Sequence, residues 1–134
     1  MKAQAAIEYM MIISIVMVII IPLFFLVNTY MYEGKEELKL KALEDSVESL
    51  AEASDMVYFQ GYPAKMSVKL YVPEGVTLAE VNENIIRVRI KTSSGEIDVI
   101  GVTQANLTGS LPTTSGIHTI TLAAQEDGLV NVSY

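Results

Sequence analysis

The sequence predicts an α+β protein, in which a long N-terminal helix, first hydrophobic and then amphipathic, precedes a C-terminal antiparallel β-sheet head. Two observations carry this prediction. Residues 10–27 form an apolar run in which Ser14 is the only polar side chain. Residues 65–132 contain short stretches of alternating apolar and polar side chains separated by turns. We therefore expect a hydrophobic helical segment that ends near residue 32, its amphipathic continuation at residues 33–60 and a β-rich head at residues 61–134.

The apolar run has the length of a membrane span. Eighteen helical residues rise about 27 Å, close to the hydrocarbon thickness of about 30 Å. No small-x-small triplet follows the run in VNTYMYEGKEEL, so we expect the run to be retained rather than removed as a secretory signal. Pro22 inside it is either a functional bend or a tolerated kink. The simplest interpretation is a single-pass anchor, and the lysine count alone would place the C-terminal part in the cytoplasm.

A helical apolar stripe continues beyond the run. Its members are separated by three or four residues: Leu40, Leu43, Val47, Leu50, Ser54 and Val57. We expect one helix from about Ala5 to Tyr58, with Gly34 marking a bend and the stop near Gly61 and Pro63. The stripe is either the seat of the chain's own sheet, which we favour, or a coiled-coil seam with another chain.

Four or five antiparallel strands are predicted after the helix. The expected strands are Lys65–Val72, Ile86–Lys91, one beginning with Ile97–Val99, one containing His118, Ile120 and Leu122 on one face, and Leu129–Val132. Pro73–Gly75 and Ser93–Gly95 are expected turns, and residues 108–112 an expected polar loop. Such a small sheet has only marginal stability alone. It gains a hydrophobic core when it packs on the amphipathic part of the helix.

Composition excludes several classes of function. Residues 33–134 hold 8 Lys and Arg against 15 Asp and Glu, which argues against nucleic acid as a partner. The chain has no cysteine, so disulfides and Cys-based zinc sites are excluded. His118 is the only histidine and sits in a strand pattern, where we expect a structural role. No catalytic motif, metal-ligand spacing or nucleotide-binding loop occurs, so we expect neither an enzyme nor a cofactor.

The residues before the apolar run raise a separate question. Glu8 is a carboxylate beside hydrocarbon, where a charge needs a partner or a role. The start reads Lys2-Ala3 followed by Gln4-Ala5-Ala6-Ile7-Glu8-Tyr9. This resembles the type IV prepilins of archaea that carry a class III signal peptide, which are cut before a Gln that has a small residue two positions on and a Glu four positions on. The family usually has Ser where Ala6 stands and Leu where Ile12 stands, both of similar size or polarity.

The resemblance implies a pilin, the structural subunit of an extracellular type IV-like pilus that serves surface adhesion. Residues 1–3 would be the leader, cut between Ala3 and Gln4, and residues 4–32 would form the filament core below the β head. The implied partners are other copies of the chain, a prepilin peptidase, and the pilus assembly platform with its ATPase. The precursor would reside in the cell membrane, and the assembled filament would lie outside the cell.

Glu8 then acquires a role in filament register. Cleavage would give Gln4 a free amine, whose ordinary pKa is about 7.7–8.0. The amine of one subunit can pair with the Glu8 carboxylate of another, and an unpaired buried charge would be worse than the pair. In the alternative interpretation, Glu8 merely complements the positive end of the helix dipole.

Two N-glycosylation sequons occur, at Asn106-Leu107-Thr108 and Asn131-Val132-Ser133. We expect Asn106 in a loop, where an acceptor belongs, and Asn131 in a strand. Surface glycans are implied by the resemblance and not by the spacing. The alternative function for the whole chain is an uncleaved single-pass membrane protein whose acidic extracellular β domain binds a ligand or partner.

Overall fold

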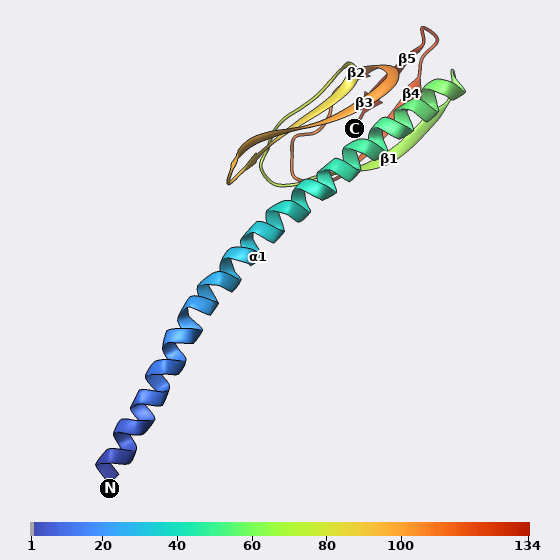
Figure 1. The fold of residues 1–134 in the computed structure, drawn as a ribbon. Coiled ribbons are helices and arrows are strands. Elements are labelled where there is room, and N and C mark those ends of the chain that lie inside the picture. Colours follow the sequence, from blue (N-terminus) through green and yellow to red (C-terminus); the bar gives the residue numbers. More distant parts are fainter. Residues whose placement is uncertain (1) are drawn as a thin grey trace. The chain divides into compact units, whose positions relative to one another are not determined.

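The computed structural model describes residues 2–134, with the side chains of residues 4–134. Helix α1 (Lys2–Gln60) precedes the strands β1 (Lys65–Val72), β2 (Val76–Thr92), β3 (Gly95–Gly109), β4 (Gly116–Ala124) and β5 (Leu129–Ser133) (Figure 1). The α+β class is confirmed, and α1 extends two or three residues beyond its predicted ends at Ala5 and Tyr58. Two compact units divide the chain at Met1–Glu37 and Leu38–Tyr134, and α1 contributes to both.

The first unit contains the apolar part of α1, which is helical through Pro22 and Gly34. Its few polar side chains bond to the helix's own backbone. Ser14 Oγ, Asn28 Nδ2 and Thr29 Oγ1 each donate to the carbonyl four residues earlier, over 2.8, 3.0 and 3.1 Å. Such bonds let a polar side chain sit in an apolar medium without an unmet donor.

In the second unit, the remainder of α1 packs on a five-stranded sheet of order β1-β4-β5-β3-β2. The predicted stripe is the buried face of the helix. Leu43, Val47, Leu50, Ser54 and Val57 are at most 1% exposed. The prediction that the stripe packs against the chain's own sheet is therefore confirmed. The coiled-coil interpretation of this stripe is wrong, because the sheet already covers it.

The sheet is mostly antiparallel, as predicted, with one exception. β1 pairs with β4, β2 with β3, and β4 with β5 in antiparallel fashion, whereas β3 and β5 run parallel. A parallel pair needs a long crossover connection. Here the chain between β3 and β5 supplies it, and that connection contains β4. The expectation of an entirely antiparallel sheet is wrong at this pair.

Strand β2 is longer than the predicted Ile86–Lys91 and folds back on itself. Lys91 N donates to Gly75 O over 2.9 Å, and Thr77 Oγ1 donates to Arg89 O over 3.5 Å. Fully extended, residues 75–91 would span about 50 Å, so the chain must reverse between these contacts. Glu83 lies midway and has a φ of 50°, which is typical of a tight reversal. The start of β2 thus lies beside its own second half.

Strand β3 also runs further than predicted, to Gly109. Asn106 therefore lies in a strand, and its placement in a loop is wrong. The inward positions Thr103 and Ala105 carry a polar and a small side chain, so the apolar alternation that reveals a strand is hidden there. The strand position predicted for Asn131 is confirmed in β5.

Candidate functional site

The first unit presents a continuous apolar surface. Between Ile7 and Tyr32, every large apolar side chain is at least 42% exposed, and Phe25 reaches 67%. By length and composition, α1 is apolar enough near its N-terminus to cross a membrane. A surface of this extent marks a site of contact with lipid or with protein.

The energetic consequence of this surface is large. Residues 10–27 include sixteen Met, Ile, Val, Leu and Phe side chains. Leaving them all in water costs roughly 25 kcal/mol, at about 1.5 kcal/mol for each side chain. That exceeds the net stability of about 5–15 kcal/mol that holds a typical domain folded. An apolar surface of this cost is typical of a segment that enters a membrane or is secreted.

Glu8 lies exposed at the start of this surface. The first turn of α1 holds no acidic residue, and the effect of the helix dipole falls off within that turn. Glu8 is therefore poorly placed to complement the dipole. It makes no ion pair with any described residue. Gln4 precedes it by one helical turn, about 6 Å along the axis, so the two predicted register residues share one face of α1.

The predicted leader, residues 1–3, falls largely outside the described part of the chain. Residue 1 and the side chains of Lys2 and Ala3 are not described. Cleavage between Ala3 and Gln4 accordingly remains a prediction from the sequence. The described neighbour of that bond, Gln4, is exposed.

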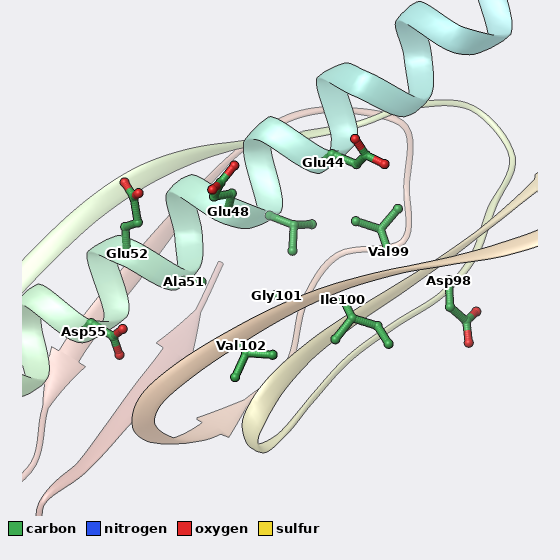
Figure 2. A pocket seen from close by; sticks show the side chains of 11 residues that line it. Glu44, Glu48, Ala51, Glu52, Asp55, Asp98, Val99, Ile100, Gly101 and Val102 are labelled. Carbon is green, nitrogen blue, oxygen red and sulfur yellow. The ribbon is translucent and has the colours of Figure 1, made fainter.

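The second unit holds a groove of about 440 Å³ between α1 and β3, here called the head groove. Figure 2 shows carboxylates on the helical side, from Glu44 to Asp55, and residues 98–102 of β3 on the other. Sequence reasoning missed this site. The signal that could have revealed it is that the helical carboxylates recur three or four residues apart on one face.

Asp55 fixes one end of the head groove. Its Oδ1 accepts hydrogen bonds from the backbone N–H of Gln104 over 2.7 Å and of Ala105 over 3.3 Å. Helix and strand also touch at Gly101, where a Cβ would lie 2.8 Å from Val47 Cγ1. Glycine is required at that position because any larger residue would push the helix off the strand. The groove is thus held between two fixed contacts.

The charges around the head groove are only partly neutralised. Arg89 binds Asp98 in a two-pronged pair, with Nε–Oδ1 at 2.6 Å and Nη2–Oδ2 at 2.9 Å. The hydrogen bond from Arg89 lowers the pKa of Asp98, and the same bond raises the pKa of Arg89. At the groove's end, Lys41 lies 3.7 Å from a Glu44 carboxylate oxygen. Glu48 and Glu52 form no ion pair with any described residue.

The remaining sequence candidates are placed as follows. Asn106 is exposed on β3 and Asn131 is half-buried on β5. His118 faces the same way as Ile120 and Leu122, as predicted, and its Nε2 lies 2.8 Å from Thr114 O. Among the described residues, no group of three or more His, Asp or Glu side chains is arranged to hold a metal ion.

No protein-family model, no curated protein and no solved structure matches this chain. The features of the chain that bear on function are the exposed apolar helix, the carboxylate beside it and the self-contained head.

Proposed function

We propose that this chain is a pilin, the structural subunit of an extracellular type IV-like filament that serves surface adhesion. One observation carries the proposal: a fully exposed apolar helical segment is joined to a head whose own core is closed. The head buries twenty apolar side chains to 8% exposure or less. It needs no help from the apolar segment for its core, which leaves that segment free to pack against other copies.

In our proposal, different surroundings cover the apolar segment before and after assembly. Lipid covers it in the membrane-bound precursor, and neighbouring apolar helices cover it after a prepilin peptidase removes residues 1–3. An assembly platform and its ATPase would drive the transfer. Because lipid tails and apolar side chains are similar surroundings, apolar burial alone does not select a register among the helices.

Glu8 supplies that selection in our proposal. Inside a bundle of apolar helices, a lone carboxylate is strongly unfavourable, whereas one paired with a cation is tolerated. The new amine at Gln4 of a neighbouring subunit is the cation that processing would create. Registers that leave the carboxylate unpaired are disfavoured, so the helices pack at a single axial offset.

The first test is the intact mass and N-terminal residue of the protein isolated from cells or shed filaments. A start at Gln4, with the apolar run retained, is the expected result. A start at Met1, together with the absence of filaments, would contradict the proposal. It would favour the alternative, a membrane-anchored protein whose acidic head binds a partner, with the head groove as the natural place for that binding.

The second test is Glu8→Gln, which keeps the side-chain shape and removes the charge. We expect filament yield to fall at least about tenfold, because breaking a buried pair leaves the neighbour's amine without its partner. Processing at Gln4 and the fold of the head should not change. Glu33→Gln is the matched control, since Glu33 lies beyond the apolar run. Normal filaments from the Glu8→Gln variant would refute the register role.

A further inference from the structure

The strand side of the head groove has an open edge. β3 pairs with β2 through residues 95–102, and its pairing with β5 begins only at Asn106. On the side away from β2, residues 98–102 therefore have no strand partner. Ile100 and Val102 in this stretch are 53% and 67% exposed. Open strand edges and exposed apolar side chains are both features that a partner covers.

The helical side of the head groove determines which chemistry fits it. Glu44, Glu48 and Glu52 follow one another at four-residue intervals, so they form a row about 12 Å long on one helix face. No cation of the described chain forms an ion pair with Glu48 or Glu52. A partner that fits the helical side of the head groove must therefore bring positive charge.

The chain itself carries cations with that spacing. Lys65 and Lys69 are exposed on β1 and form no ion pair with any described residue. Four strand residues separate their Cα atoms by about 13 Å, against about 12 Å for the full row from Glu44 to Glu52 and about 6 Å for the unpaired Glu48 and Glu52 alone, a difference that the long lysine side chains can span. By contrast, Lys41, Arg87 and Arg89 already pair with carboxylates of their own chain.

These lysines cannot reach the groove of their own head. They alternate with Met66, Val68 and Leu70, which face the core, so they project from the sheet face opposite α1. In addition, two strands separate β1 from β3 in the sheet. Any contact between Lys65 or Lys69 and the carboxylate row must therefore involve a second copy.

We propose that the head groove binds Lys65 and Lys69 of a second copy of this chain. The proposal rests on the proposed filament function and adds a head-to-head contact to it. The groove and the lysines are different surfaces, so each copy offers both. Contacts of this heterologous type repeat from copy to copy, and where the rotation does not close they generate a helical filament.

Engineered disulfides test the contact directly, because the chain has no cysteine of its own. Full-length Glu48→Cys and Lys69→Cys variants, carrying different tags, are co-expressed and oxidised within filaments. We expect mixed dimers and nothing larger. A single chain carrying both substitutions should give a ladder of covalent oligomers, because each copy then links to two neighbours. Lys69→Cys combined with Glu126→Cys, in the turn before β5, is the control and should give no ladder.

Charge reversal provides a second test of the contact between the lysines and the head groove. Lys65→Glu with Lys69→Glu should lower filament yield by about tenfold or more, because like charges then face each other. Adding Glu48→Lys and Glu52→Lys to the same chain should restore the yield, which also excludes misfolding as the cause. The control is Glu74→Lys with Glu126→Lys, two exposed positions outside the head groove, which should change little.

The outcomes separate this inference from the function on which it rests. The head contact alone would be overturned if processed protein forms filaments, the chain carrying both Glu48→Cys and Lys69→Cys gives no ladder, and the lysine reversals are tolerated. Protein that begins at Met1 and forms no filaments would overturn the pilin proposal, and the head contact with it. Closed dimers in place of a ladder would contradict the heterologous geometry.

Discussion

Two segments of the same helix differ in their relation to water. Between Ile7 and Tyr32, apolar side chains surround α1 and are exposed, whereas between Leu43 and Val57 one stripe is buried and carboxylates occupy the other side. The first segment has no polar face to turn toward solvent, and the second has one. The second segment is stabilised by packing on the sheet of its own chain, whereas the apolar side chains of the first remain exposed.

Truncating one large apolar side chain in each segment tests this difference and should have the largest effect. Leu50→Ala removes a side chain that is 0% exposed and should lower the free energy of unfolding of the head by about 2–5 kcal/mol. Ile19→Ala removes one that is 63% exposed and should leave that free energy unchanged. The free energy of unfolding of each variant is measured by adding denaturant to the full chain in detergent. Hydrogen exchange of the β-strand amides is the readout. Equal losses would mean that the two segments form one cooperative core.

The contact between α1 and β3 offers a smaller effect within the head. Asp55→Ala removes the acceptor for the backbone N–H groups of Gln104 and Ala105 and should cost about 1–3 kcal/mol of stability. Asp55→Asn keeps an oxygen acceptor and should recover most of the loss. Glu52→Ala, one turn away on the exposed side, should stay within about 0.5 kcal/mol. If Asp55→Ala behaves like Glu52→Ala, the contact does not stabilise the head.

The same contrast shows which parts of the fold could be predicted from the sequence. The amphipathic part of the helix and the strand Lys65–Val72 were predictable because each buries one face, and a buried face imposes a period of 3.6 or 2 on the apolar residues. The later half of β3 was not predictable in this way. Its inward residues Thr103 and Ala105 are buried without being large and apolar, so no period appears.

Features that depend on distant residues were missed for a different reason. The parallel pairing of β3 with β5 joins Asn106 to Leu129, and no local pattern encodes a partner so far along the chain. The head groove likewise combines residues 44–55 with residues 98–102. Glu8 stands out in the sequence alone because its setting is local: a carboxylate lies directly before an apolar run. Its pairing with a neighbour's amine stays a prediction.

The smallest expected effect concerns how carboxylates in the two units respond to acid. Asp98 has a partner in its own head, since Arg89 lowers its pKa through a hydrogen bond. The folded pKa therefore lies below the unfolded value of about 3.9, and the stabilisation is present above that value and lost as the pH falls through the folded pKa.

Arg89→Gln should flatten the pH dependence of the head's unfolding midpoint below about pH 4, while Lys69→Gln should leave it unchanged. Glu8 forms no ion pair with any described residue, so Glu8→Gln should alter assembly and leave this unfolding profile as it is. A profile that Arg89→Gln does not change would show that the ion pair of Arg89 with Asp98 contributes nothing to the head.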